Sequence, residues 1–318
     1  MSVGDNIKRR RFERKMSQQE LADAMGYKTR TTIAKIEAGI NDVSQKKLQK
    51  FAEVLEVPVE SLITGLSAPQ IPTEQTASPL VGNKNVVIIL AGGKSGRNRQ
   101  NIPSQFLSVN SRPILTYSMT AYEKHPLINE IYVVCLKGWE SIVRAYAKEY
   151  GITKLRGIFL GGTCGILSLK NGLDAIRDRM HKDDLVLIQE STRPHVTPEI
   201  ISRLIQVLEE KKSATVCHSM NDYVQFDVSG DTPKYVNRDS TLALQSPEAH
   251  RFSVLNEVFE KAEKEGHLLN ESCFTMLMYH LGYEINFIKS SVNNIKIARE
   301  EDLAAFATKI KEEMAPFS

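Results

Sequence analysis

A glycine-rich stretch with basic residues follows an apolar run near residue 90. The run VVII (86–89) leads directly into LAGGKSGRNRQNIPSQFL (90–107). Backbone N–H groups of a glycine-rich loop after a strand can surround a phosphate, and Lys or Arg can neutralise its charge. The stretch therefore predicts a phosphate-binding loop, and the alternative is a tight strand-to-helix turn with incidental charges.

Two common nucleotide-binding signatures do not fit this loop. A Walker P-loop needs GxxxxGK[ST], and the GKS tripeptide (93–95) would place its first glycine at Ile88. Gly92, Gly93 and Gly96 also lack the spacing of a dinucleotide-binding GxGxxG. A phosphate site here must be of another kind.

The elements that would position this loop alternate along the chain. Apolar runs separated by amphipathic segments occur at 86–90, 130–134, 185–188, 215–220 and 284–288. This alternation is typical of βαβ units and a mostly parallel sheet. Residues 67–85 carry three prolines and no apolar periodicity, which predicts a linker between domains at 1–66 and 86–318.

The N-terminal domain reads as helical throughout, with helices expected at about 5–15, 17–25, 31–38, 44–55 and 59–63. Ser17 and Glu20 form a capping box for the second helix, while Gly26 and Gly39 end the second and third. The expected core residues are Leu21, Ala24, Ile33, Ile36, Leu48, Phe51 and Leu55.

Positive charge is concentrated in this N-terminal domain. Residues 1–66 hold 12 Lys/Arg and 9 Asp/Glu, whereas the remainder holds 29 of each. Such an excess suits nucleic acid, although an anionic membrane or a solvated helix face would also explain it. We find no signal peptide, no membrane-spanning run and no zinc spacing among the four cysteines, so we expect a cytoplasmic protein without a metal site of its own.

Residues 16–62, from MSQQELADAMG to VPVESL, resemble the Cro/phage-repressor family of helix-turn-helix domains. The resemblance implies binding of double-stranded DNA, with the third helix in the major groove. Arg30 is the best candidate for a guanine contact, and Gln19, Asn41 and the KRRR run (8–11) are candidates for phosphate contacts. A helical protein-interaction module that has lost DNA binding is the alternative. The candidate DNA-binding residues are Gln19, Lys28, Thr29, Arg30, Thr31 and Lys35.

The second domain resembles the cytidylyltransferases of 2-C-methyl-D-erythritol 4-phosphate and ribitol 5-phosphate. AGGKSGRN and PSQFL are similar to the family opening AGGxGxRM…PKQFL. Further similar segments follow in the family's order: LGGTCGILSLKNGL (160–173), IQESTRPHV (188–196), YVNRDSTLALQSPEAHRF (235–252), LNESCF (269–274) and NNIKIAREEDLAAF (293–306).

This resemblance implies an enzyme fold that joins CTP, carried with Mg²⁺, to a polyol phosphate and releases pyrophosphate. The expected fold class is an all-α helix-turn-helix domain followed by an α/β Rossmann-like nucleotidyltransferase domain with a mostly parallel sheet. Residues 219–238 would form a β-arm that hooks around a partner subunit, so a homodimer is expected. A two-fold dimer would present two helix-turn-helix domains to a palindromic operator.

The resemblance also assigns roles to individual positions. Arg97, Lys296 and Ser104 occupy catalytic positions of the family. Glu190, Arg193, Arg238 and Ser246 occupy positions that bind the acceptor phosphate. The nucleotide-binding positions are Ala91, Gly92, Gly93, Ser95, Gly96 and Ser168. As ordinary alternatives, Arg193 could pair with a nearby carboxylate and Ser168 could be a helix N-cap.

Several positions depart from the family pattern. Ser104 stands where the family has the lysine of PKQ, and losing such a cation from an anionic transition state costs on the order of 10²-fold in rate. Lys94 and Arg99 are candidates to replace it. The other departures are Ser95, Gly165, Gln189, Glu190 and Asn270.

Two functions therefore remain open, while a third, a purely structural dimerisation domain, would need the retained basic residues to be accidental. The first is a DNA-binding transcription regulator whose cytidylyltransferase-like domain binds CTP and is catalytically impaired or sensory. The alternative is an active cytidylyltransferase for a polyol phosphate, with a DNA-binding domain that regulates its own pathway.

Overall fold

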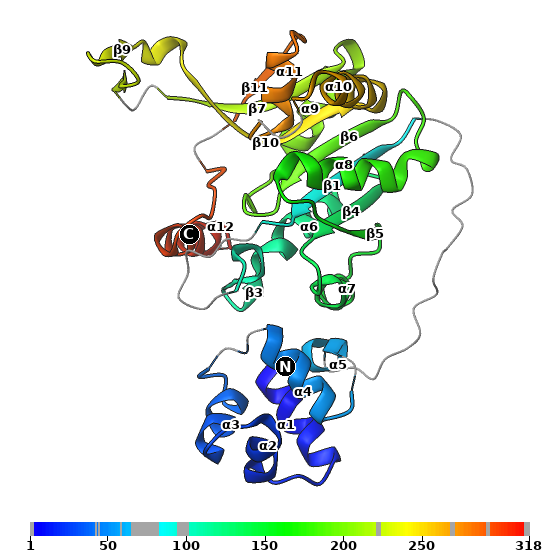
Figure 1. Ribbon diagram of the computed structural model, residues 1–318, viewed down its shortest axis with the longest axis vertical. Coiled ribbons are helices and arrows are strands. Elements are labelled where there is room, and N and C mark those ends of the chain that lie inside the picture. Colours follow the sequence, from blue (N-terminus) through cyan, green and yellow to red (C-terminus); the bar gives the residue numbers. More distant parts are fainter. Residues whose placement is uncertain are drawn as a thin grey trace. The chain divides into compact units, whose positions relative to one another are not determined.

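The computed structural model describes residues 3–41, 43, 45–57, 59–64, 83–93, 102–220, 224–267, 271–290 and 293–314. These residues form two compact units, one made of helices and one of α/β type, and each is described by itself (Figure 1). No helix in these ranges is long and apolar enough to span a membrane.

The helical unit begins with five short helices. They are α1 (Val3–Glu13), α2 (Gln18–Met25), α3 (Arg30–Glu37), α4 (Gln45–Val54) and α5 (Val59–Thr64). The capping box is confirmed, because the Glu20 backbone N–H donates to Ser17 Oγ and the Ser17 N–H donates to Glu20 Oε2. Gly26 ends α2 at φ +78°, in the left-handed region that glycine adopts without strain. The five predicted helices are confirmed to within a few residues.

The core of this unit contains all but one of the predicted residues. Leu21, Ile33, Ile36, Leu48, Phe51 and Leu55 are buried, as are Ile7, Met25 and Leu62. The prediction was wrong for Ala24, which is exposed. The buried face of α2 passes through Leu21, Ala22 and Met25. At about 100° per residue, Ala24 lies on the side of that face toward solvent.

A buried ion pair joins three helices of this unit. Arg11 Nε lies 2.7 Å from Glu37 Oε1, and Arg11 Nη2 lies 3.1 Å from Glu37 Oε2, so the contact is bidentate. Gln18 Nε2 adds a third donor, 2.9 Å from Glu37 Oε2. Because Arg11 is buried and paired, it is not available as a DNA phosphate contact.

The α/β unit is organised around a seven-stranded sheet. Its order is β11 (Phe287–Lys289), β7 (Ser213–Ser219), β10 (Leu242–Arg251), β6 (Leu185–Glu190), β1 (Asn85–Ala91), β4 (Glu130–Cys135) and β5 (Leu155–Leu160). Only β10 is antiparallel to its neighbours. The predicted mostly parallel sheet is confirmed.

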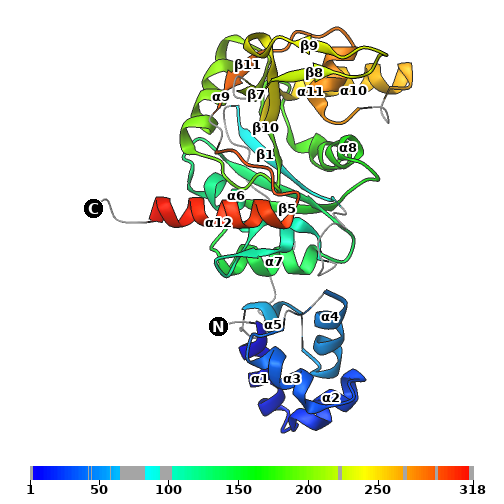
Figure 2. The ribbon, with the colours of Figure 1, turned by 90° about the vertical axis from the view of Figure 1, so that its left-hand side faces the viewer.

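Helices cover both faces of the sheet (Figures 1 and 2). One face carries α8 (Gly165–Ile176), α10 (Phe252–Glu265) and α11 (Phe274–His280), whose apolar residues share one cluster with β1, β4 and β6. The opposite face carries α6 (Ile114–Lys124) and α9 (Pro198–Glu210). The helix α12 (Glu300–Met314) also belongs to this unit, whereas α7 (Glu140–Glu149) is grouped with the helical unit. This layering leaves the carboxyl ends of the parallel strands at one edge of the unit.

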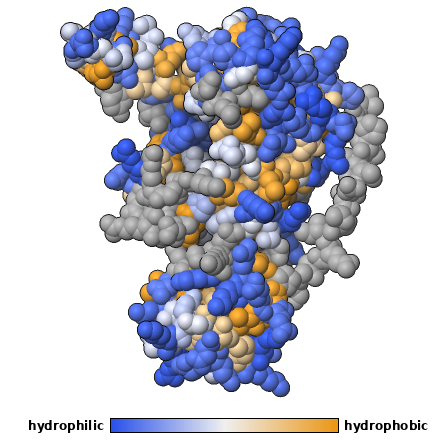
Figure 3. All heavy atoms as spheres, viewed as in Figure 1, coloured by the Kyte–Doolittle hydropathy of each residue, from blue (hydrophilic) through white to orange (hydrophobic). Residues whose placement is uncertain are grey.

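The predicted arm is present as a small hairpin. β8 (Gln225–Asp227) and β9 (Lys234–Val236) pair antiparallel, outside the main sheet. Its exposed apolar side chains are visible as patches on the surface (Figure 3). They are Val224, Phe226, Val228 and Tyr235.

Candidate nucleotide and anion site

The candidate site lies where β1 and β6 end. These strands are parallel neighbours, so their carboxyl ends meet at the same edge of the sheet. The Ser191 hydroxyl donates to Leu90 O at 2.7 Å and holds the turn after β6 against β1. The Ile297 backbone N–H donates to Thr192 O at 2.7 Å. Residues 293–297, distant in sequence, are thereby brought to this edge.

Opposite charges meet at that point. Glu190 Oε2 lies 3.0 Å from Arg193 Nε, and Glu190 Oε1 lies 2.7 Å from Lys296 Nζ. Arg193 Nη1 also donates to Asn294 O at 2.8 Å. One carboxylate between two cations leaves a net positive charge, which favours an anionic ligand. The predicted positions Glu190, Arg193 and Lys296 are thus brought together, and Arg193 pairs with a carboxylate as the ordinary alternative anticipated.

Ser246 joins these residues from the antiparallel strand β10. Its Oγ accepts the Glu190 backbone N–H at 3.1 Å and a hydrogen bond from Gln189 Nε2 at 3.1 Å. Gln189 Nε2 also contacts Glu190 O and Arg193 O, so its two hydrogens are shared among three acceptors, while its Oε1 accepts from the Tyr122 hydroxyl at 2.9 Å. We call Glu190, Arg193, Ser246 and Lys296 the Glu190 cluster.

Sequence reasoning missed two buried residues that hold this cluster. Gln189 and Tyr122 are both fully buried. Burial raises the pKa of the Tyr122 hydroxyl well above its ordinary value, so it stays a proton donor. Gln189 was noticed only as a departure from the family's histidine, and nothing in the sequence linked Tyr122 to it across 67 positions.

Of the predicted glycine positions, Gly92 lies close to the helix α8, whereas a Cβ added at Gly93 would meet nothing within 4 Å. A Cβ added at Gly92 would be 3.2 Å from Ser168 Oγ, and one at Gly161 would be 3.1 Å from the same atom. The Ser168 hydroxyl accepts from the Gly162 N–H and donates to Cys164 O. Ser168 is therefore not the N-cap of α8. The N-cap is Cys164, and Ser168 lies inside the helix, where its hydroxyl bonds back to the preceding turn.

The first residues of the glycine-rich loop are held by a glutamine. Gln105 is buried in the 3₁₀ turn Ser104–Phe106, and its Nε2 donates to Ala91 O at 2.7 Å and Gly93 O at 3.1 Å. Ser104, the departure from the family lysine, is itself buried. The predicted residues Ser95, Gly96 and Arg97, with Lys94 and Arg99, lie outside the described residues.

Arg238 is not brought to the Glu190 cluster within this chain. It lies in the exposed 3₁₀ turn Arg238–Ser240, between the arm and β10, and none of the hydrogen bonds among the described residues links it to the cluster. The predicted role of Arg238 in acceptor binding therefore stays a prediction.

The predicted DNA-binding residues lie together on the helical unit. Lys28, Thr29, Arg30, Thr31 and Lys35 are exposed at the start and along the outer face of α3. Gln19 is exposed on α2 and donates to Asp23 Oδ1 at 2.8 Å. Thr29 is the N-cap of α3 but makes no side-chain capping bond, so its hydroxyl is not used by that helix.

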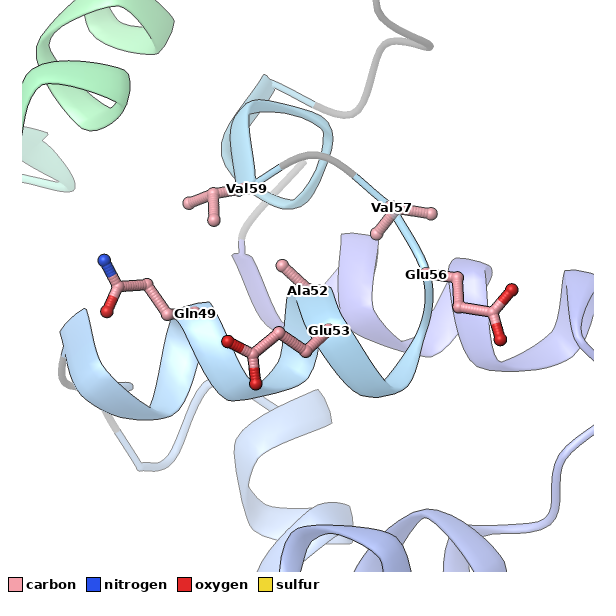
Figure 4. A pocket seen from close by; sticks show the side chains of 6 residues that line it. All are labelled: Gln49, Ala52, Glu53, Glu56, Val57 and Val59. Carbon is pink, nitrogen blue, oxygen red and sulfur yellow. The ribbon is translucent and has the colours of Figure 1, made fainter. Parts of the chain in front are cut away.

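A pocket in the helical unit does not suit a phosphate. It is lined by Gln49, Ala52, Glu53, Glu56, Val57 and Val59 of α4, α5 and the turn between them (Figure 4). Two carboxylates and no cation line it, so an anionic ligand would be repelled. The Glu190 cluster remains the better candidate for a nucleotide or phosphate.

The Mg²⁺ that the family implies fits here only as an ion carried by the nucleotide. Among the described residues, no three His, Cys, Asp or Glu side chains are grouped as a metal site. The Glu190 cluster offers one carboxylate, and Mg²⁺ commonly binds through one or two carboxylates together with substrate phosphates. When bound, the ion would supply neutralisation of phosphate charge.

Comparisons with known proteins agree with this geometry. Residues 85–312 match the family described as 2-C-methyl-D-erythritol 4-phosphate cytidylyltransferase, and residues 7–62 match a helix-turn-helix family. The ribitol-5-phosphate cytidylyltransferase of Lacticaseibacillus paracasei is 30% identical over 227 residues, 71% of this chain and 97% of that protein. A 2-C-methyl-D-erythritol 4-phosphate cytidylyltransferase of Clostridium botulinum is 32% identical, covering 70% of this chain and 95% of the relative.

Solved structures share the fold of the α/β unit. The 4-diphosphocytidyl-2C-methyl-D-erythritol synthase of Anaerococcus prevotii matches with a TM-score of 0.62 at 21% identity, covering 72% of this chain and 99% of that one. The corresponding cytidylyltransferase of Francisella tularensis matches with a TM-score of 0.59 at 22% identity, covering 71% and 100%. The predicted fold class is confirmed for both parts of the chain.

Proposed function

The chain belongs to the 2-C-methyl-D-erythritol 4-phosphate cytidylyltransferase family, and on this premise we propose that it is a DNA-binding transcription regulator with a nucleotide-binding but catalytically impaired α/β domain. The helix-turn-helix domain would bind duplex DNA through the exposed face of α3. The α/β domain would bind CTP with Mg²⁺ and a polyol phosphate, which makes it a sensor of that metabolism.

One observation carries the proposal: the binding cluster is assembled while a catalytic cation is replaced. Glu190 is within ion-pair distance of both Arg193 and Lys296, which supports an anion site at this point. By the sequence resemblance Ser104 stands at the position of the family lysine, and it is 4% exposed. A buried neutral hydroxyl in place of a cation that would stabilise an anionic transition state supports binding without efficient turnover.

The alternative is an active cytidylyltransferase whose DNA-binding domain regulates its own pathway. The retained cations favour it, because Lys296 is half exposed and its Nζ can reach a ligand phosphate from its contact with Glu190. The relatives reported above also carry the names of active enzymes. Both functions predict CTP binding, and they differ in turnover.

The deciding experiment measures binding and turnover on the same preparation. Calorimetric titration with CTP and Mg²⁺ is followed by a pyrophosphate-release assay with ribitol 5-phosphate and with methylerythritol phosphate. We expect binding with slow release, and we expect Ser104→Lys to raise the release rate by on the order of 10²-fold. Fast release by the unaltered protein would establish the alternative, and no CTP binding would exclude both.

The matched control for the lysine substitution is Ser108→Lys. Ser108 lies four positions further along, on the short strand β2 (Ser108–Val109), and is exposed. It adds the same charge to the same region without entering the buried position. A rate increase in both variants would show a general charge effect and would remove Ser104 from the argument.

A further inference from the structure

The hydrogen bonds around Ser246 fix the direction of its hydroxyl. Both of its recorded partners are donors, namely the Glu190 backbone N–H and Gln189 Nε2, each 3.1 Å from Oγ. Neither nitrogen can accept a hydrogen bond, since an amide N–H only donates. The Ser246 proton therefore has no acceptor in either contact and must point elsewhere.

The orientation of the Gln189 amide is itself determined. Its Nε2 lies 2.8 Å from Glu190 O and 2.9 Å from Arg193 O, and carbonyl oxygens only accept, so the NH₂ group must face them. Its Oε1 accepts from the Tyr122 hydroxyl at 2.9 Å, so the oxygen side of the amide is fixed as well. Rotating the amide would place an oxygen against two carbonyls, at a cost comparable to several lost hydrogen bonds.

We propose that Gln189, held by Tyr122, is a positioning residue that makes Ser246 an obligate hydrogen-bond donor toward an anionic oxygen of the acceptor phosphate. This inference rests on the proposed function, because it needs a polyol phosphate at the Glu190 cluster. Ser246 is 7% exposed and Gln189 is fully buried, so water does not compete for the hydrogen bonds that orient these two side chains. A phosphate oxygen without a proton satisfies the hydroxyl, whereas a ligand group that only donates does not.

Ser168 shows what a hydroxyl without this constraint does. It accepts from the Gly162 N–H at 3.0 Å and donates to Cys164 O at 2.8 Å, so its proton is used within the chain. In the part of the chain that the structure describes, Ser246 acts only as an acceptor. Both serines were predicted to contact a ligand, but only the Ser246 hydroxyl has a hydrogen that remains available to donate to one.

The test replaces the donor group that Gln189 presents to Ser246 with an acceptor. Gln189→Glu replaces the NH₂ group with an oxygen that only accepts when the carboxyl is ionised, and the titrations are run at high pH because the two facing carbonyl oxygens favour its protonation. The Ser246 proton should then turn toward the carboxylate and away from the ligand. Affinity for ribitol 5-phosphate is measured by calorimetry with a non-hydrolysable CTP analogue present. In the unaltered protein, Ser246→Ala should weaken this affinity about tenfold to a hundredfold. In the Gln189→Glu background, the same substitution should change it less than about threefold.

Two further variants separate direction from packing. Ser246→Thr keeps the hydroxyl and should keep the affinity to within about threefold. Ser118→Ala is the matched control, because Ser118 is also buried and its hydroxyl donates to Leu115 O inside α6, so its loss should leave the affinity unchanged. Affinity for the CTP analogue alone should stay within about twofold in every variant, since no nucleotide contact is assigned to Gln189.

If the Gln189→Glu protein is not folded by circular dichroism, Gln189→Met decides instead. It removes the amide at nearly equal length and should weaken ribitol 5-phosphate binding about threefold to tenfold. An unchanged affinity in that variant, or a full Ser246→Ala penalty in the Gln189→Glu background, overturns the inference while the proposed function stands. If the unaltered protein binds neither CTP nor ribitol 5-phosphate, the inference and the proposed function both fail.

Discussion

Lys296 Nζ lies 2.7 Å from Glu190 Oε1, although 106 positions separate the two residues in the chain. Lys296 contributes one ion pair to the Glu190 cluster from the C-terminal segment, and Arg193 contributes the other from the turn after β6. A lysine ammonium is a compact charge on a flexible stem, so it can exchange this carboxylate for a phosphate without moving the backbone. Under the proposed function, the ion pair is the charge-neutral arrangement of Lys296 before an anion binds.

The first prediction concerns this amine. Lys296→Met should lower the affinity for CTP about tenfold to a hundredfold, because a charge-assisted hydrogen bond is lost and Glu190 then repels phosphate. Calorimetric titration measures it. Lys289→Met on β11 is the control, since that lysine is also exposed and has no assigned ligand. Equal affinities in all three proteins would place the nucleotide away from Lys296.

The second prediction concerns DNA. Arg30→Ala should weaken binding to a selected operator by about 1–3 kcal/mol and relax the preference at one base pair. Lys35→Ala should weaken binding to every duplex similarly and reduce the salt slope by about 1. Anisotropy titrations at several salt concentrations distinguish the two, with Arg203→Ala on α9 as control. Binding that does not depend on salt would exclude the phosphate contacts.

The third prediction concerns the buried ion pair of the helical unit. Glu37→Gln leaves the Arg11 guanidinium buried without a full partner, and we expect the unit to lose about 3–5 kcal/mol of stability. Hydrogen exchange of α1–α3 amides in the full chain measures this loss. Glu56→Gln, which breaks the exposed pair with Arg14, should cost far less. Similar losses in both variants would mean that burial of the pair is unimportant.

The fourth prediction concerns the close approach of the glycine loops. Gly161→Ala places a methyl group 3.1 Å from Ser168 Oγ and 3.3 Å from Gly92 Cα, so the loops must separate. We expect a loss of about 1–3 kcal/mol in unfolding free energy, and weaker CTP binding. Gly230→Ala in the arm is the control, because its added Cβ meets nothing within 4 Å. Intact CTP affinity in the Gly161 variant would mean that the loop spacing does not shape the site.

The fifth prediction concerns the arm. Phe226→Asp should convert a homodimer into a monomer, because Phe226, Val224 and Val228 expose apolar surface that a second copy would cover. Sedimentation velocity measures the change. Asp231→Asn in the exposed turn between β8 and β9 is the control and should leave the dimer intact. A monomer before any substitution would remove the homodimer from the proposed function.

The sequence predicted those features that depend on local signals. The capping box at Ser17 and the glycine after α2 placed helix boundaries, because capping is decided within four residues. The resemblance placed Glu190, Arg193 and Lys296 in one site, which local patterns could not do. The prediction that Ala24 belongs to the core was wrong because a single alanine carries too little apolar area to show which face of a short helix is buried.

Apart from β5 (Leu155–Leu160), which was also absent from the predicted strands, the unpredicted parts are long-range or polar. The strand β10 was not recognised, because its buried stretch contains Ser246, Glu248 and His250 in place of an apolar run. Gln189 and Tyr122 were not recognised as partners because their contact is a tertiary hydrogen bond between a strand and a helix. Such contacts leave no periodic signal in a single sequence.

The course of β10 has a consequence for divergence within the family. Its pairing with β7 is interrupted between Leu244 and Glu248, and its pairing with β6 begins only at Glu248. Residues 245–247 therefore have no ladder partner on either side, and Ser246 among them contacts the Glu190 cluster. Under the proposed function, substitutions at these three positions would change the surface that meets the acceptor while costing the sheet few hydrogen bonds. The choice of polyol phosphate could then change without any change to the sheet itself.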